Sequence, residues 1–437
     1  MSKVVGTLRR EPGTVRRRGR EVSWRTRART RLTTAGVILA SVVLPVTNAT
    51  PATAADGGTY AYVANFTDDS VSVVNTKTNL ITDTITTGEG IGNGPNDVVM
   101  TPNGKLAYIP NFNAGTVTAI DTATNLAAPG SPITIGPAIS TGPTNAAVSP
   151  KGDFVYVTNQ LVPSVSVIDT ATNLVTDTIT AGDGIGVGPR GVVVNPLLPR
   201  AYVASAVGTV AVIDTTNNSV IDTIASAGEP RGLAVTPDGA RLYVTNFTGN
   251  SVTVVDTATN LPTPDSPITV GIGTAPRNPA VTPNGDFVYV PNSTSDSVSV
   301  IRTSDNTVTD TITALEGIGN NPFSVEVNPA GTFAYVTNSD DDTVSAIDTV
   351  TNAVAETFAV GEAPRGLAVG AVPGTGSVPC PVGQVVTGGG AEITGPEPSN
   401  FVSKPADEPD NAWEVSLTNP TNQDITVMPY AVCSDPT

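Results

Sequence analysis

A four-residue pattern, Tyr-Val-Thr-Asn in its commonest form, recurs along the chain and constrains the fold more than any other feature. Its seven copies begin at Tyr62, Tyr108, Tyr156, Tyr202, Tyr243, Tyr289 and Tyr335. Successive copies start 46, 48, 46, 41, 46 and 46 residues apart. A repeat of this length, built from short apolar runs between turns, accommodates about four strands. The sequence therefore predicts an all-β fold, a seven-bladed β-propeller over residues 58–370.

One copy shows the unit expected in each blade. Strands are predicted at 230–235, 241–246, 251–257 and 266–270, with the turns TPDG and TATN between them. Pro and Gly have the backbone angles that such turns need, and Asp and Asn side chains can bond nearby backbone amides. We therefore interpret the repeated Asp and Asn residues as turn formers and not as catalytic groups.

The order of the strands predicts how the ring closes. The innermost strands are expected to begin at Pro95, Pro143, Pro189, Pro230, Pro276, Pro322 and Pro364. The chain enters the repeat at 59–65 with a second strand, whereas the innermost strand at 364–369 comes last and has no second strand after it. We therefore expect residues 364–369 to complete the first blade by pairing with residues 59–65.

The first 54 residues differ in composition from the repeats. They contain 11 of the 22 Lys and Arg residues, followed by an apolar run at 35–46 and small residues at 52–55. This order is typical of a secretory signal peptide, which we expect to be cleaved near Ala54 or Ala55. The apolar run is shorter than the ~20 residues of a membrane span, although a membrane anchor is the alternative. The sequence predicts a secreted or cell-surface protein without a stable membrane span.

Removal of residues 1–54 makes the chain strongly acidic. It leaves 11 basic residues (22 − 11) and 37 acidic ones (39 − 2), a formal net charge of −26. Such a surface repels nucleic acid and anionic membranes. We expect a soluble, monomeric protein whose partner is an extracellular protein or a cell-wall glycan.

The sequence after residue 370 departs from the repeat. Residues 371–379 are expected to be a linker, and residues 380–437 a small β-rich C-terminal domain. Cys380 and Cys433 are the only cysteines, and an exported chain meets oxidising conditions, so a disulfide between them is predicted. With two thiols and no histidine in the whole chain, no metal site is predicted.

The seven motif copies, together with the recurring turn VIDTATN, resemble the YVTN family of β-propeller repeats, known from surface-layer and other exported proteins. The resemblance covers residues 58–370 and implies a seven-bladed propeller. Residues 380–437 resemble, more loosely, small β-rich modules at the ends of secreted actinobacterial proteins. Because one scaffold hosts many functions, the resemblance implies a fold more specifically than a function.

Four of the innermost strands have an arginine directly after their proline. These are Arg190, Arg231, Arg277 and Arg365, and the equivalent positions elsewhere hold Asn96, Thr144 and Phe323. In a propeller these positions meet near the mouth of the central channel, where arginines can bind an anion through charge-assisted hydrogen bonds. Alternatively, each guanidinium pairs with a loop acid such as Glu229, Glu362 or Asp183. We predict the four arginines as candidate ligand-binding residues.

Two further readings concern the loops and the absence of histidine. The acidic loops at Asp68–Asp69 and Asp340–Asp342 suggest calcium, but their spacing matches no known calcium loop, so no cofactor is predicted.

No histidine base and no close Ser, Lys or Cys arrangement is present, so we predict no catalytic residue and no enzyme activity. The predicted function is a non-catalytic binding or structural scaffold. A lactonase-like propeller hydrolase is the alternative.

Overall fold

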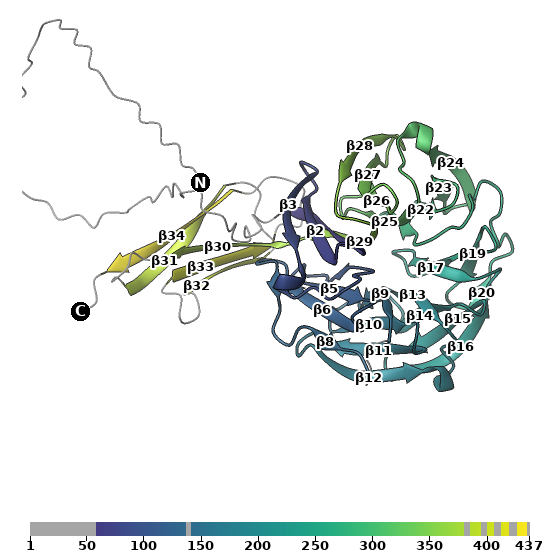
Figure 1. Cartoon of the computed structure of the whole chain (residues 1–437), viewed down its shortest axis with the longest axis horizontal. Helices are drawn as coiled ribbons and strands as arrows, with labels where there is room; N and C mark the ends of the chain where they lie inside the picture. Colours follow the sequence, from purple (N-terminus) through teal and green to yellow (C-terminus); the bar gives the residue numbers. More distant parts are fainter. Residues whose placement is uncertain are drawn as a thin grey trace, which may run out of the picture. The chain divides into compact units, whose positions relative to one another are not determined.

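The computed structural model describes residues 58–136 and 141–379, with side chains up to residue 373, and the backbone of further strands at 385–394, 400–405, 412–418 and 426–434. Between residues 58 and 372 the strands form seven antiparallel sheets, which surround a central axis (Figure 1). The predicted all-β, seven-bladed propeller is therefore confirmed. Three short 3-10 helices lie in loops, at Thr87–Glu89, Ala181–Asp183 and Ala314–Glu316. No helix within the described ranges is long and apolar enough to cross a membrane.

The innermost strands line the axis. They are β29 (Pro364–Ala371), β4 (Val99–Met100), β9 (Pro143–Val148), β13 (Pro189–Val194), β17 (Pro230–Val235), β21 (Ala280–Val281) and β25 (Pro322–Val327). Each contacts the innermost strand of the next blade, and β29 contacts both β25 and β4, so the cycle is closed. Five of them begin at the predicted proline. At Pro95 and Pro276 the structure has only an isolated bridge before the strand. One reason why β21 begins late is Pro279, which directly precedes it and has no N–H to donate to the neighbouring strand.

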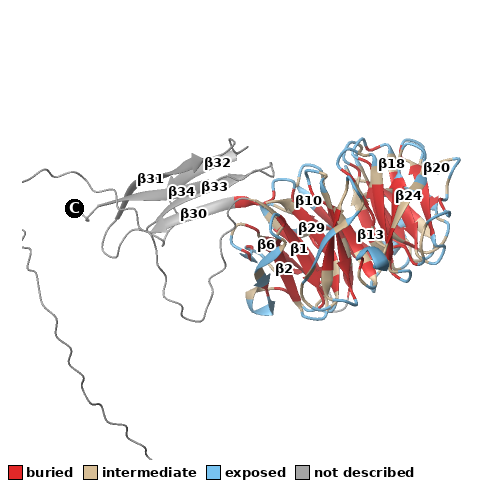
Figure 2. Ribbon diagram, turned by 90° about the horizontal axis from the view of Figure 1, so that it is seen from above, coloured by how far each residue is buried: buried red, intermediate tan, exposed pale blue. Residues whose placement is uncertain are grey.

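The second strands carry the repeated motif, and the third strands pair with them. The second strands are β1 (Thr59–Asn65), β5 (Leu106–Asn111), β10 (Phe154–Asn159), β14 (Arg200–Ser205), β18 (Arg241–Asn246), β22 (Phe287–Asn292) and β26 (Phe333–Asn338). The third strands are β2 (Ser70–Asn75), β6 (Thr116–Asp121), β11 (Ser164–Asp169), β15 (Thr209–Asp214), β19 (Ser251–Asp256), β23 (Ser297–Arg302) and β27 (Thr343–Asp348). Both faces of these strands are buried, and the loops are exposed (Figure 2). The second strands are correspondingly mostly apolar, whereas most third strands also bury a Ser or Thr between their apolar residues, such as Ser72, Ser166 and Ser299.

The outer strands are less regular than the repeat predicts. They are β3 (Leu80–Ile85), β7 (Leu126–Ala127), β8 (Ile133–Thr134), β12 (Leu174–Thr180), β16 (Ser219–Ala225), β20 (Leu261–Pro262), β24 (Thr307–Thr313) and β28 (Val354–Ala359). The strand predicted at 266–270 is reduced to a bridge between Val252 and Ile268. Three prolines between residues 262 and 267 lack the N–H that a continuous ladder requires, so the outer strand of this blade is interrupted.

The ring closes as predicted. Strand β29 pairs antiparallel with β1, with Leu367 opposite Val63 and Val369 opposite Ala61. Leu367 and Val369 are buried against Tyr335 of the seventh blade. The last repeat segment therefore completes the first blade and also packs against the last one.

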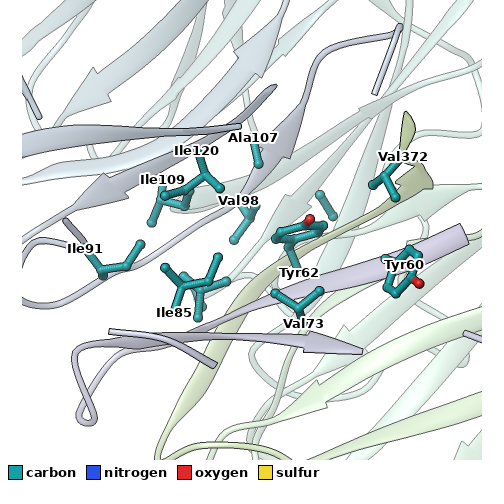
Figure 3. Close-up of a cluster of buried hydrophobic side chains, with 13 residues drawn as sticks. Tyr60, Tyr62, Val73, Ile85, Ile91, Val98, Ala107, Ile109, Ile120 and Val372 are labelled. Atoms are coloured by element: carbon teal, nitrogen blue, oxygen red, sulfur yellow. The ribbon is translucent and has the colours of Figure 1, made fainter. Parts of the chain in front are cut away.

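The hydrophobic core is divided into seven clusters, one between each pair of neighbouring blades. Figure 3 shows the cluster between the first two blades, where Tyr62 and Ile85 lie near Ile109 and Ile120. Because each cluster lies between two sheets, no apolar packing is needed on the axis itself. The axis is therefore free to carry polar side chains.

The motif tyrosines also join neighbouring blades by hydrogen bonds. In five blades the tyrosine hydroxyl donates to an asparagine Oδ1 in a turn of the next blade; the pairs are Tyr62–Asn125, Tyr108–Asn173, Tyr156–Asn218, Tyr243–Asn306 and Tyr289–Asn352. These asparagines have a positive φ, for example 55° at Asn352, which asparagine tolerates better than most residues. The recurring TATN turn is therefore both a turn and a link between blades.

Tyr289→Phe should destabilise the protein more than Tyr202→Phe. The Tyr289 hydroxyl donates to Asn352 Oδ1 at 2.7 Å. For Tyr202 the corresponding turn asparagine is Asn260, whose Oδ1 instead accepts a hydrogen bond from Arg200 Nη1 at 3.3 Å. The buried Tyr202 hydroxyl lies near Arg200 and Asn195 but has no hydrogen bond in the described structure. We expect Tyr289→Phe to lower the free energy of unfolding by about 1–2 kcal/mol and Tyr202→Phe by about 0.5 kcal/mol or less, as measured by chemical denaturation. Equal losses in the two variants would contradict this account of the inter-blade bond.

Beyond the propeller the structure describes backbone only. Strands β30 (Pro373–Pro379), β33 (Ala412–Thr418) and β32 (Asn400–Pro405) form one sheet, and β31 (Val385–Thr394) and β34 (Thr426–Ser434) form another. Residues 371–379, predicted to be a linker, thus contain β30, whose backbone pairs with β33 along its whole length. Cys380 lies outside the described residues and the side chain of Cys433 is not described, so their disulfide stays a prediction. Residues 1–54, the predicted signal peptide, also lie outside the described residues.

Candidate functional site

The four arginines predicted from the repeat line one cavity at the channel mouth. Arg190, Arg231 and Arg365 each follow the proline that begins an innermost strand, Arg277 follows the equivalent Pro276 before β21, and this shared repeat position brings the four together. The cavity has a volume of about 530 Å³. Its walls also include Asn96, Thr144 and Phe323, the equivalent residues of the other three blades, and the amides of Asn145 and Asn278.

The arginines differ in how they are paired. Glu229 Oε1 forms ion pairs with Arg190 Nη2 at 3.0 Å and with Arg231 Nη2 at 3.2 Å, and the second contact is also a hydrogen bond, so one carboxylate serves two guanidinium groups. Arg365 Nη1 donates to Asn96 Oδ1 at 2.6 Å. The Arg277 guanidinium group has neither a hydrogen bond nor an ion pair in the described structure. The alternative prediction, that loop acids neutralise each arginine, therefore holds in part.

The other two predicted loop acids form no ion pair with these arginines among the described residues. The Asp183 carboxylate instead accepts hydrogen bonds from the backbone N and Oγ1 of Thr180, at 2.8 Å and 2.7 Å. Glu362 lies in the loop before β29, and its backbone N donates to Asp68. The four guanidinium groups are thus balanced by one directly bound carboxylate in this part of the chain.

Phenylalanine rings stack on three of the arginines. The Arg365 Cζ atom lies 3.3 Å from the centre of the Phe66 ring, and Arg231 Cζ lies 3.5 Å from that of Phe247. Arg277 lies between two rings, at 4.4 Å from Phe323 and 5.1 Å from Phe247. These cation–π contacts hold the guanidinium groups without using their N–H donors. The sequence analysis missed Phe66 and Phe247, although both directly follow a motif asparagine.

The arginine cluster has unsatisfied donors. The Nε groups of Arg190, Arg231 and Arg277 are buried and have no hydrogen-bond partner in the described structure. Burial lowers the pKa of Arg231, Arg277 and Arg365 to about 10, and for Arg231 and Arg277 neighbouring arginines add to this effect. All three stay positively charged at neutral pH. Since a buried, unpaired donor costs about 1–3 kcal/mol, an anion in this cavity would relieve a cost already present.

The acidic loops connect neighbouring blades. Asp69 Oδ1 accepts from the backbone N of Gly94 at 2.7 Å, and Asp342 Oδ1 accepts from that of Ala363 at 2.8 Å. Asp68 Oδ2 accepts from the backbone N of Glu362 at 2.7 Å. No group of three or more acidic, histidine or cysteine side chains that could hold a metal ion is found among the residues described. The carboxylates considered as calcium ligands thus have structural partners.

Two carboxyl groups near the axis were missed by the sequence analysis. Asp97 Oδ2 accepts from the backbone N of Ala146 at 3.1 Å and from Asn145 Nδ2 at 3.2 Å. Glu326 lies on β25, three residues or about 10 Å further along the strand than Phe323. Burial raises the pKa of Asp97 to about 7 and that of Glu326 to about 8, and the Asp97 charge adds to the second shift. Neither carboxyl forms an ion pair among the described residues.

A second cavity adjoins the arginine-lined one. It has a volume of about 520 Å³ and is lined by Phe247, Arg277, Ser293, Thr294, Asp296, Asn320, Asn321 and Asp340. Arg277, Asn321 and Asp340 line both cavities. The two cavities therefore share a wall that contains one basic and one acidic side chain.

Comparison with known proteins gives a family and a fold. A protein-family model described as "Lactonase, 7-bladed beta-propeller" matches residues 39–271 and 230–369. Among similar solved structures, one titled Kuenenia stuttgartiensis Hydrazine Synthase has 22% identity and a TM-score of 0.54, covering 62% of this chain and 88% of that one. A functionally unknown protein from Desulfotomaculum acetoxidans has 18% identity and a TM-score of 0.59, covering 71% and 98%. At such identities the two structures show the fold alone. No curated protein matches the chain.

The family match corrects one prediction. The sequence analysis predicted that the chain is not an enzyme, because it contains no histidine base and no close Ser, Lys or Cys arrangement. A match to a family described by a hydrolytic activity, over most of the propeller, contradicts that prediction. The sequence pattern did not distinguish a buried carboxyl from the many carboxylates that form turns. Asp97 is such a buried carboxyl, and its pKa of about 7 lies in the range in which a histidine side chain titrates.

Proposed function

Because this chain belongs to the lactonase family of seven-bladed β-propellers, we propose that the cavity at its channel mouth is the functional site and that it binds a small organic anion. One observation carries this proposal. Three guanidinium Nε groups around one cavity are buried without a partner. Carboxylate or phosphate oxygens are the partners that arginine donors prefer. A cavity of about 530 Å³ also has the size of a small-molecule site.

Arg277 is the principal anchor of the proposed anion. It is the one arginine of the four whose guanidinium group has no hydrogen bond or ion pair in the described structure, and two phenylalanine rings hold it in place. Little side-chain entropy is lost when a ligand binds to a group that is already ordered. Arg190 and Arg231 already share Glu229 and therefore contribute less free charge.

Arg277→Met should weaken the binding of carboxylate or phosphate ligands by about 10- to 100-fold, since one charge-assisted hydrogen bond contributes about 1.5–3 kcal/mol. Isothermal titration calorimetry with a panel of small carboxylates and phosphate esters measures this loss. The matched control is Arg302→Met, which removes an exposed arginine paired with Asp305 at 2.6 Å and should leave affinity unchanged. Equal affinity in the Arg277 variant and the parent would overturn the proposal.

Hydrolysis of a lactone at the same site is a second candidate function, favoured by the family match. A water molecule would attack the ring carbonyl carbon, and arginine N–H donors would stabilise the negative charge that develops on the carbonyl oxygen. The ring C–O bond would then break, one proton of the water would pass to the released alkoxide oxygen and the other to solvent, giving a hydroxycarboxylate. Activity of the purified protein on a lactone panel, lost in Arg277→Met, supports this candidate. Anion binding without turnover of any lactone leaves the first function alone.

We further propose that the protein acts outside the cell, where the loops around the channel mouth contact an extracellular protein or a cell-wall glycan. The signal-peptide pattern of residues 1–54 and the charge of −26 that remains without them support this location. Fractionation of producing cells into medium, wall and membrane tests it, and recovery in the cytoplasm alone would refute it.

A further inference from the structure

Arg277 and Asp340 face the same two cavities without binding each other. Both residues line the arginine-rich cavity and the adjoining one. The Asp340 charge acts on the Arg277 guanidinium, so the two lie near each other, but no ion pair within 4.0 Å joins them in the described structure. Opposite charges that remain apart at one cavity leave both free to contact a ligand.

Other contacts keep each side chain in its place. Arg277 is held between the rings of Phe247 and Phe323. Asp340 Oδ1 accepts from Asn321 Nδ2 at 2.9 Å, while its Oδ2 has no hydrogen bond among the described residues. The backbone N of Asn321 donates to Asp296 Oδ1 at 2.8 Å, which fixes the loop that carries this amide. One donor group and one acceptor group are therefore positioned before any ligand arrives.

The two cavities differ in charge. Four arginines line the first, together with the Asp340 carboxylate. The titratable residues around the second are Arg277, Asp296 and Asp340, so acids outnumber bases there. A ligand that spans the shared wall would place its anionic group in the first cavity and a hydrogen-bond donor toward the second.

We propose that the two cavities form one site for a small organic acid that also carries a hydroxyl or an ammonium group. Arg277 donates to the acid group, and Asp340 Oδ2 accepts from the hydroxyl or ammonium. This inference rests on the proposed function because it uses the same anion anchor, and it adds the class of ligand. Asp340 would select against acids without a donor, because its carboxylate would then lose water without gaining a partner.

A matched series of ligands tests the inference on the full chain. The probes are butyrate and its 2-, 3- and 4-hydroxy and 2-, 3- and 4-amino derivatives, which vary the position and the kind of donor. Calorimetric titration should show at least one derivative that binds at least 10-fold more tightly than butyrate. Asp340→Asn should remove that excess while butyrate binding persists. Asp305→Asn, which alters an exposed carboxylate paired with Arg302, is the matched control and should retain the excess.

The outcomes separate this inference from the function on which it rests. Derivatives that bind no more tightly than butyrate, or an excess that survives Asp340→Asn, would overturn the inference. Butyrate binding that is lost in Arg277→Met would in that case still support the anion site. Failure of butyrate and of every derivative to bind would overturn both. Asp340 lies in an exposed loop, so we expect its substitution to leave the ring folded, and circular dichroism of each variant checks this.

Discussion

Replacing strand β29 by a Gly-Ser segment of equal length is expected to open the ring and to abolish the cooperative thermal transition of the closed propeller. The replacement removes Leu367 and Val369 from the interface with Tyr335, and burial of each such side chain contributes about 1.5–3 kcal/mol. It also weakens the backbone pairing with β1 from Thr59 to Asn65, because glycine disfavours the strand conformation, and β1 becomes an exposed edge when that pairing is lost. Exposed edges associate with other chains, so aggregation should accompany the loss.

Differential scanning calorimetry and size-exclusion chromatography measure this effect. The control is Leu315→Ser, which alters a side chain that is 99% exposed and should leave both measurements unchanged. An unaltered melting temperature together with a monomeric elution volume in the β29 variant would show that the ring does not depend on this closure.

Glu326→Gln should stabilise the protein at alkaline pH. The folded-state pKa of Glu326, about 8, lies above its ordinary value of 4.5 because burial disfavours the charged form. Stability from this group is therefore fully present below about pH 4.5 and is lost as the pH rises through about 8. The Gln variant lacks that loss, so its advantage should grow between pH 6 and pH 9 and reach about 2–4 kcal/mol. Denaturant unfolding at several pH values measures the difference.

Glu316→Gln is the control, with the opposite sign. The Glu316 carboxylate accepts from the backbone N of Thr313 at 2.8 Å, and this hydrogen bond lowers its pKa. Its contribution is present above its ordinary pKa and is lost at acid pH, so the variant should gain nothing as the pH rises. If the stability of Glu326→Gln stays parallel to that of the parent from pH 5 to pH 9, the buried carboxyl does not titrate as described.

Much of the fold could be predicted because the same physical requirement recurs in every blade. The motif strand must be buried on both faces, and the turn asparagine must accept a positive φ and, in most blades, a tyrosine hydroxyl. Those requirements leave pairs such as Tyr289 and Asn352 at a nearly constant spacing of 62 to 65 residues. The outer strands were predicted less well, because Pro264 and its neighbours break the ladder in one blade. At the edge of a sheet, a missing ladder hydrogen bond lowers the stability of the fold only slightly, so prolines are tolerated there.

The candidate site could be predicted only where its residues share a repeat position. The four arginines do, and aligning the blades was sufficient to find them. Glu326 was overlooked, although its equivalents in the other blades, such as Ala234 and Ala280, are small and apolar. The sharing of Glu229 by Arg190 and Arg231, and the stacking of Phe247 on Arg231 and Arg277, depend on how adjacent loops fold over the mouth. Sequence spacing does not report those contacts.

The place where the ring closes has a mechanical consequence. The backbone N of Val372 donates to the carbonyl oxygen of Gly58 at 2.9 Å, so the chain enters and leaves the propeller at adjacent points. Tension applied between flanking segments on the two sides would load the β1–β29 ladder and spare the other six blades. That ladder would separate first, while strands β13 and β17, which carry Arg190 and Arg231, would bear no direct load until it had separated.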